Sequence, residues 1–192
     1  ELTVHADIED EAQTVTVVVP EIKTEASTDE KKETTIGGEI TIEDIVSYHN
    51  LTPGKKYVVK GTLMNKTTGK PVTVNDEPVT AEAAFTPETR DGEVKVAFIF
   101  NSYVITETTD VVVFESLYRE EVEIAVHADI EDEGQSVTVY VPEIKTTASI
   151  DGKKEITTAG KVTIEDVVSY TNLIPGTEYT IRGLSLIHIS EP

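Results

Sequence analysis

The stretch "HADIEDEAQTVTVVVPEIKT" (residues 5–24) shows how this chain is organised, because it returns almost unchanged as "HADIEDEGQSVTVYVPEIKT" (residues 127–146). The two copies lie 122 positions apart, and the match holds without a gap as far as Gly61 and its counterpart Gly183. A fixed-period repeat is the sequence signature of an array of similar structural units. We therefore expect tandem repeats joined in a rod.

The repeat also divides the chain. We expect one complete domain over residues 20–141, preceded by the C-terminal remnant of an upstream repeat over residues 1–19. The N-terminal part of a downstream repeat should occupy residues 142–183. The match stops there, and "LSLIHISEP" lacks the hairpin sequence that follows Gly61, so residues 184–192 are expected to be a non-native tail.

Within the complete unit, apolar and polar residues alternate along short segments, which is typical of half-buried strands. Turn sequences with glycine or proline separate the segments, as at residues 52–54, 68–70 and 91–92. Short strands with a turn about every ten residues favour an all-β fold, an antiparallel immunoglobulin-like β-sandwich. The predicted strands are 13–19, 21–26, 40–48, 55–64, 92–100 and 110–117.

Composition and charge exclude several classes of function. The formal net charge of the 192 residues is −20, and so acidic a surface repels nucleic acid and anionic membranes. No apolar run is long enough to cross a membrane, so membrane insertion is not expected. The chain contains no cysteine, which excludes disulfides and thiolate metal sites, and no cofactor is expected.

Four polar residues stand on otherwise apolar strand faces: Thr24, Asp44, Glu115 and Gln135. A buried carboxylate is costly unless it is neutralised or paired, so four such residues on four strands are expected to meet. A threonine hydroxyl is a nucleophile only with help from a base or a polarised electrophile. With His127 to move a proton, Thr24 would attack the Gln135 carbonyl and release ammonia, leaving an ester.

The motifs around these positions resemble the Thr–Gln ester-bond domains, or VaFE repeats, of Gram-positive adhesin stalks. The resemblance covers about residues 1–183 and includes "EIKTEA", "VVVFE" and "VHADIEDEGQSV", with one substitution at the start of the family's name motif. It implies a Thr24–Gln135 crosslink assisted by Asp44, Glu115 and His127.

By the same resemblance, each flanking remnant carries part of a further site. His5 and Gln13 belong to an incomplete upstream site, and Thr146 and Asp166 to an incomplete downstream site. The implied function is a structural stalk module on an extracellular, cell-wall-anchored protein, with neighbouring repeats as partners. Crosslink formation would be a single-turnover event, and the module is not expected to be an enzyme. A host ligand would be bound by another domain.

Other interpretations remain open at this point. Lys23 and Lys145 precede the two threonines and suggest a Lys–Asn isopeptide domain, although Lys23 alternates to the opposite face and the last strand offers glutamine. A ligand-binding sandwich has no tryptophan or aromatic platform to support it. The acidic residues Asp129, Glu131, Asp132 and Glu133 are candidates for calcium, but a solvated loop suits their spacing better. Asn50 and Asn65 match a glycosylation pattern.

Overall fold

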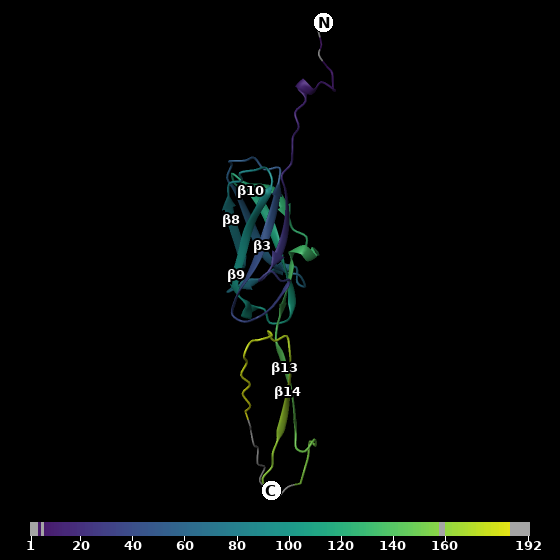
Figure 1. The fold of residues 1–192 in the computed structure, drawn as a ribbon, viewed down its shortest axis with the longest axis vertical. Helices are drawn as coiled ribbons and strands as arrows, with labels where there is room; N and C mark the ends of the chain where they lie inside the picture. Colours follow the sequence, from purple (N-terminus) through teal and green to yellow (C-terminus); the bar gives the residue numbers. More distant parts are fainter. Residues whose placement is uncertain (1–3, 5, 158–159, 185–192) are drawn as a thin grey trace.

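The computed structural model describes residues 4, 6–157 and 160–184. His5 and residues 185–192 of the predicted tail lie outside the described residues. A two-layered β-sandwich forms the middle of the molecule (Figure 1). An extended N-terminal arm with the short 3-10 turn η1 (Glu11–Gln13) leads into it, and a separate hairpin follows it. Among the described residues, no helix is long and apolar enough to cross a membrane.

The first layer is a three-stranded antiparallel sheet in the order β1-β3-β9. Its strands alternate between buried and exposed residues, as in β3, where Ile42, Asp44, Val46 and Tyr48 are all buried. The alternation is the direct consequence of side chains that point to opposite faces at successive positions. The strands are β1 (Glu21–Ser27), β3 (Glu39–His49) and β9 (Gly92–Asn101).

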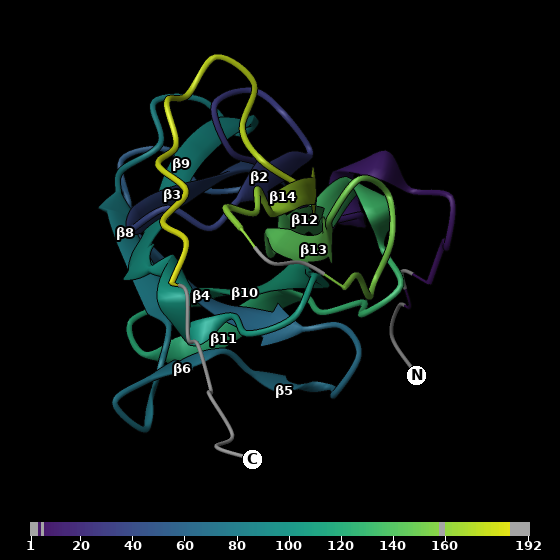
Figure 2. The same ribbon diagram turned by 90° about the horizontal axis from the view of Figure 1, so that it is seen from below.

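The second layer has seven strands and packs face to face on the first, as the end view in Figure 2 shows. Its main path runs β2-β12-β10-β4-β5, while β11 pairs with β10 and β8 pairs with β4. Its strands are β2 (Glu33–Thr35), β4 (Tyr57–Asn65), β5 (Lys70–Pro71), β8 (Thr80–Phe85), β10 (Thr109–Arg119), β11 (Val122–His127) and β12 (Ser136–Tyr140). The short turns η2 (Ser102–Val104) and η3 (Glu133–Gln135) and the small hairpin β6 (Thr73–Val74) and β7 (Glu77–Pro78) complete this unit.

Two features depart from the expected fold. The sandwich is all-β as predicted, but β2 and β12 pair in parallel, so the sheet is not purely antiparallel. The predicted strand over residues 13–19 is wrong for this chain: Val15 and Val17 are each 85 % exposed and pair with no strand among the described residues. The repeat counterpart of residues 14–18 is β12, which is held by β10 and β2. The arm has no such neighbours, and alternation alone does not make a strand without them.

The core fills the space between the two layers. Phe98, Leu63, Val113 and Leu117 are fully buried, and they come from strands on both layers. The predicted strands near residues 21, 40, 55, 92 and 110 all form, because each supplies an apolar face to this shared interior.

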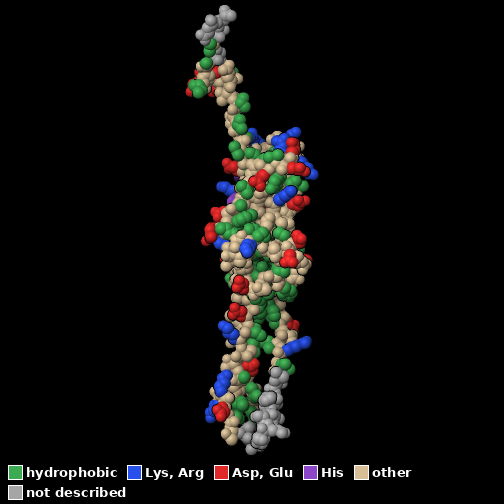
Figure 3. All heavy atoms as spheres, turned by 180° about the vertical axis from the view of Figure 1, so that it is seen from behind, with side chains coloured by type: hydrophobic (Ala, Val, Ile, Leu, Met, Phe, Trp, Pro, Cys, Tyr) green, Lys and Arg blue, Asp and Glu red, His purple; other side chains and the backbone are tan. Residues whose placement is uncertain are grey.

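The hairpin of β13 (Glu143–Ser149) and β14 (Glu165–Thr171) repeats the register of β1 and β3. Thr24 pairs with Val46, and its counterpart Thr146 pairs with Val168. This second hairpin has no covering sheet among the described residues. Hydrophobic side chains therefore lie at the surface of the lower part of the molecule (Figure 3), among them Ile144, Val167 and Tyr170.

The same kind of hydrogen bond, from an asparagine side chain to a backbone carbonyl, is present at both ends of the complete unit. Asn50 adopts a left-handed φ of 63° and donates from Nδ2 to the carbonyl of Val19 at 3.1 Å. Asn172 has a φ of 60° and donates in the same way to Val141 at 3.1 Å. Asparagine tolerates this backbone conformation better than most residues. Each contact fixes the residue that precedes a proline, Pro20 or Pro142, where one unit passes into the next.

Candidate functional site

Thr24, Glu115 and Gln135 meet at the edge of the core, although they lie far apart in the chain. The Nε2 atom of Gln135 donates a hydrogen bond to Oγ1 of Thr24 and another, at 3.1 Å, to Oε2 of Glu115. Gln135 and Glu115 are fully buried, while Thr24 is half-buried. The structure thus brings together three of the four residues that were predicted to meet.

Each sheet contributes one part of this site. Thr24 on β1 and Asp44 on β3 come from the three-stranded sheet, where Asp44 lies opposite Ala26. Glu115 comes from β10 of the other sheet, with Gly61 of β4 opposite it on one side and His127 of β11 on the other. The site therefore exists only when the two layers are packed together.

Gln135 does not lie in a strand, and the prediction that it does is wrong. It is the last residue of η3, a single 3-10 turn that precedes β12. The carboxylate of Asp132 caps this turn and accepts a hydrogen bond from the backbone N–H of Gly134 at 2.7 Å. An aspartate at this position satisfies a backbone donor that a short turn leaves unpaired. The cap fixes the direction in which the Gln135 side chain leaves the backbone.

Asp44 and Glu115 form a buried pair of carboxyl groups. Burial raises the pKa of both above their ordinary values, and the neighbouring Asp44 raises that of Glu115 further. The pKa of Glu115 is raised to about 11, so this acid carries its proton at neutral pH. Interaction with Glu115 partly offsets the effect of burial on the pKa of Asp44. Two adjacent carboxyl groups that share a proton are a familiar source of one strongly raised pKa.

Several oxygens of the site are buried and have no hydrogen-bond partner among the described residues. They are both carboxyl oxygens of Asp44, Oε1 of Glu115 and Oε1 of Gln135. Orphaned buried oxygens are costly. A half-turn of the Gln135 amide would exchange its nitrogen and oxygen and let the carbonyl accept from the protonated Glu115.

His127 is held by an acid of the loop that precedes Gln135. Its Nε2 lies 2.9 Å from Oδ2 of Asp132. Burial acts to raise the pKa of Asp132, but the His127 ring and the N–H of Gly134 outweigh it and hold that pKa below its ordinary value. No hydrogen bond joins His127 to Thr24 or Gln135 in the part of the chain that the structure describes. The ring lies beside the site rather than within its hydrogen-bond network.

Asp132 was predicted to belong to a solvated acidic loop. It is half-buried and joins His127 to the turn that carries Gln135. The repeat itself held the signal for this role. The aspartate three residues before the glutamine recurs at Asp10, which caps η1 before Gln13 through the N–H of Ala12. Within the described residues, no group of three or more acidic or histidine side chains is arranged to hold a metal ion.

Gln13 of the upstream site lies on the N-terminal arm, whereas Thr146 and Asp166 of the downstream site lie on the paired strands β13 and β14. Gln13 is exposed at the end of η1, and Thr146 and Asp166 are exposed on β13 and β14. His5 lies outside the described residues. The alternative interpretation was an isopeptide crosslink from a lysine. Lys23 is exposed on β1, facing away from the buried Ile22. Lys145 is likewise exposed on β13.

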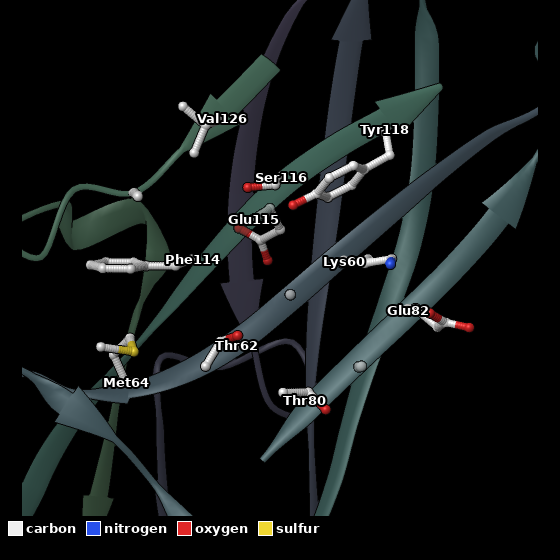
Figure 4. Close-up of a pocket in the computed structure, with 13 residues that line it drawn as sticks. Lys60, Thr62, Met64, Thr80, Glu82, Phe114, Glu115, Ser116, Tyr118 and Val126 are labelled. Carbon is white, nitrogen blue, oxygen red and sulfur yellow. The ribbon is translucent and has the colours of Figure 1, made fainter. Parts of the chain in front are cut away.

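A cavity of about 720 Å³ lies in a different place from this site. It lies on the outer side of the second sheet, where Lys60, Thr62, Glu82 and Tyr118 surround it (Figure 4). Lys60 and Thr62 on β4 and Tyr118 on β10 alternate with the buried residues of these strands, which face the core. Glu115 borders the cavity, but Thr24, Asp44 and Gln135 do not. Of the candidate site residues, Asp44 and Gln135 are fully buried away from this cavity.

A known protein family matches this chain in sequence, and solved structures resemble it in fold. The family model described as "T-Q ester bond containing domain" matches residues 20–139 and matches again over residues 142–187. No curated protein matches the chain. Among solved structures, a bacterial adhesin from Mobiluncus mulieris that contains intramolecular disulfide, isopeptide and ester bond cross-links is similar in fold. In one crystal form the TM-score is 0.54 at 16 % identity, covering 81 % of this chain and 77 % of that chain. In a second crystal form the TM-score is 0.51, again at 16 % identity, with 80 % and 76 % covered.

Proposed function

Because the chain belongs to the T-Q ester bond containing domain family, we propose that its complete unit forms an intramolecular ester between Thr24 and Gln135. The observation that carries this is the buried contact in which the Gln135 amide meets both the Thr24 hydroxyl and the Glu115 carboxyl. A nucleophile, an electrophile and a proton donor are then held together before any reaction begins. Such proximity replaces a bimolecular encounter and lowers the barrier by several kcal/mol.

In the proposed reaction, Oγ1 of Thr24 attacks Cδ of Gln135. The new bond joins these two atoms, and the bond between Cδ and Nε2 breaks. The proton of the Thr24 hydroxyl is transferred to the departing nitrogen, which leaves as ammonia. The products are one ester and one ammonia, so the step needs no oxidant, metal or other reactant.

The two acids and the histidine have distinct parts in this proposal. Protonated Glu115 donates to the Gln135 carbonyl as negative charge develops there, which is the task of an oxyanion-stabilising donor. Burial and the neighbouring Asp44 raise the pKa of Glu115, so the part of Asp44 is to keep Glu115 protonated. His127, whose ring is held by Asp132 and whose side chain is partly exposed, would carry protons between the site and water. Burial of the site protects the ester from hydrolysis.

The product is a bond within the protein, so the reaction occurs once in each molecule. We infer a structural module rather than an enzyme. Thr24 lies on the first strand of the unit and Gln135 directly before the last, so the ester would join its two ends. A pulling force applied through the termini would then pass along the crosslinked strands instead of unfolding the sheets between them.

A module with these properties suits the stalk of a bacterial surface adhesin. The fold likeness to an adhesin that itself carries ester cross-links supports this assignment. The chain would act outside the cell, anchored to the cell wall of a Gram-positive bacterium, with repeats of the same polypeptide as neighbours in a rod. Pro20 and Pro142, with the asparagine contacts beside them, suit short and stiff junctions.

Mass spectrometry of the purified chain tests the ester. The intact mass should be lower than the sequence mass by one ammonia, and tandem spectra should join the peptide around Thr24 to the peptide around Gln135. Because a Lys–Asn bond releases ammonia as well, Thr24→Ala is the necessary second sample. The loss must disappear in that variant. An unreduced mass in folded wild-type protein, or a loss that survives Thr24→Ala, would rule out this ester.

A further inference from the structure

Lys32 joins the two segments that carry the crosslinking residues. It follows the tight turn between β1 and β2, where Thr28 and Lys31 exchange backbone hydrogen bonds. Its Nζ donates to the carbonyl of Ala26 at 2.6 Å and to the carbonyl of Gly134 at 2.7 Å. Ala26 lies two residues beyond Thr24, and Gly134 directly precedes Gln135. One ammonium group thus bridges the threonine strand and the glutamine turn.

We propose that Lys32 is a positioning residue for ester formation, which holds the turn that carries Gln135 against the strand that carries Thr24. This inference rests on the proposed Thr24–Gln135 chemistry. Hydrogen bonds from a charged donor are stronger than those between neutral groups. Two of them to carbonyls on separate segments restrict how far η3 moves away from β1.

Other contacts at the same place agree with this role. A Cβ at Gly134 would lie 3.8 Å from the Thr24 carbonyl oxygen, so the turn already packs closely on β1. The backbone carbonyl of Lys32 accepts from the N–H of Thr138 at 2.8 Å, which ties the start of β2 to β12. Lys32 also places positive charge near Asp44, which acts to lower the pKa of that acid. The residue is thus well placed to influence both the geometry and the electrostatics of the reaction.

The downstream hairpin shows that half of this contact forms without a glutamine turn. Lys154, the counterpart of Lys32, donates to the carbonyl of Ala148 at 2.6 Å, and Ile150 and Lys153 repeat the turn. The described residues provide no η3 counterpart for that hairpin. The lysine is therefore oriented by its own hairpin first, and it presents a free donor to the carbonyl that precedes the glutamine when the last strand docks.

Lys32→Met and Lys32→Arg provide the test, with Lys31→Met as the matched control. Methionine keeps an unbranched chain but removes the charge and the donors, whereas arginine keeps both. Lys31 is a neighbouring exposed lysine of the same turn. Each full chain is synthesised in vitro, and its loss of ammonia is followed over time by intact mass spectrometry between pH 5 and pH 9. We expect Lys32→Met to slow crosslinking at least tenfold, with Lys32→Arg within threefold of wild type and Lys31→Met unchanged.

A second measurement separates positioning from general stability and from the ester itself. In the Thr24→Ala background, where no crosslink forms, Lys32→Met should speed amide hydrogen exchange at residues 133–135, and Lys32→Arg should restore it. Exchange in β4 and β9 should not change. Crosslinking of Lys32→Met at the wild-type rate, or equal slowing by Lys32→Arg, would overturn the proposal. Absence of ammonia loss in wild type would reject the ester, while the exchange result would still decide whether Lys32 holds the turn.

Discussion

Gly61 lies directly opposite Glu115 in the ladder between β4 and β10, and its missing side chain makes room for the site. A Cβ at this position would overlap the ring of Phe98 and lie 3.5 Å from Oε1 of Glu115. The backbone of Gly61 has no left-handed φ, so space and not conformation requires a glycine here. The same glycine recurs at Gly183 in the repeat.

Replacement of this glycine tests that close approach. Gly61→Ala should destabilise the domain by about 1–3 kcal/mol, since inserted groups in a packed core force neighbours to shift. Denaturant unfolding in the Thr24→Ala background measures the change without a crosslink. Gly37→Ala is the control, because its Cβ would meet only the Thr35 carbonyl oxygen, at an ordinary 3.9 Å. Equal stability of the two variants would contradict the steric explanation.

The shared proton of Asp44 and Glu115 predicts which variants fail to crosslink. Glu115→Gln keeps the shape of the side chain but cannot deliver a proton to the Gln135 carbonyl. We expect a folded domain with little or no loss of ammonia, and the same for Asp44→Asn and His127→Ala. Circular dichroism checks folding, and intact mass reports the bond. Full crosslinking in all three variants would mean that proximity alone suffices.

The raised pKa values also predict how stability depends on pH. In Thr24→Ala protein the folded state retains protons on Asp44 and Glu115 that the unfolded state releases. The stabilisation of the folded state that these protons provide is therefore complete at acidic pH. It is lost as pH rises above the unfolded values near 4 towards the raised folded values. Each retained proton changes the free energy of unfolding by about 1.4 kcal/mol per pH unit within that window.

Glu115→Gln in the same background isolates this effect. Glutamine mimics the protonated acid, so the double variant should gain stability over Thr24→Ala as pH rises from 4 to 8. Unfolding midpoints measured at each pH provide the comparison. Parallel curves for the two proteins would show that Glu115 does not bind a proton more tightly in the folded state.

The crosslink itself should contribute strongly to stability. It would close a loop between residues 111 positions apart, which on the model used for disulfides is worth about 5 kcal/mol. Thr24→Ala should therefore lower the unfolding midpoint markedly and make the domain more sensitive to protease. Thr24→Ala/Glu115→Gln serves as a comparison, since it also lacks the bond. A wild-type midpoint equal to that of Thr24→Ala would contradict this estimate.

The two flanking remnants should not form a bond with each other across molecules. Gln13 of one molecule and Thr146 of the next are complementary, and exposed strand edges favour pairing. The composite site would lack the glutamate, however, because the counterpart of β10 is missing from both remnants. We expect at most non-covalent end-to-end association. A ladder of oligomers on denaturing electrophoresis, joined at Gln13 and Thr146, would show that the glutamate is dispensable.

The sequence alone was sufficient for much of the fold, and it named residues that the structure brings together, such as Thr24 and Gln135. Alternating apolar positions predicted β1, β3, β4, β9 and β10, because these strands each bury one face in a common core. The repeat drew attention to Thr24 and Gln135, because Thr24 recurs as Thr146 and Gln135 repeats Gln13. Carboxyl groups on an apolar face indicated that Asp44 and Glu115 would meet, since neither is stable there without a partner.

Other features depend on contacts between segments that are far apart in the chain, and these were seen only in the tertiary structure. Residues 13–19 and β12 have nearly the same sequence, yet only β12 is a strand, because its neighbours β10 and β2 are present. The parallel pairing of β2 with β12 joins segments more than a hundred residues apart, which local patterns do not report. Asp132 was expected to lie in a solvated loop, and Lys32 was not singled out in the sequence. Their roles depend on which backbone groups and rings the fold places within hydrogen-bond distance, at His127 for Asp132 and at Gly134 for Lys32.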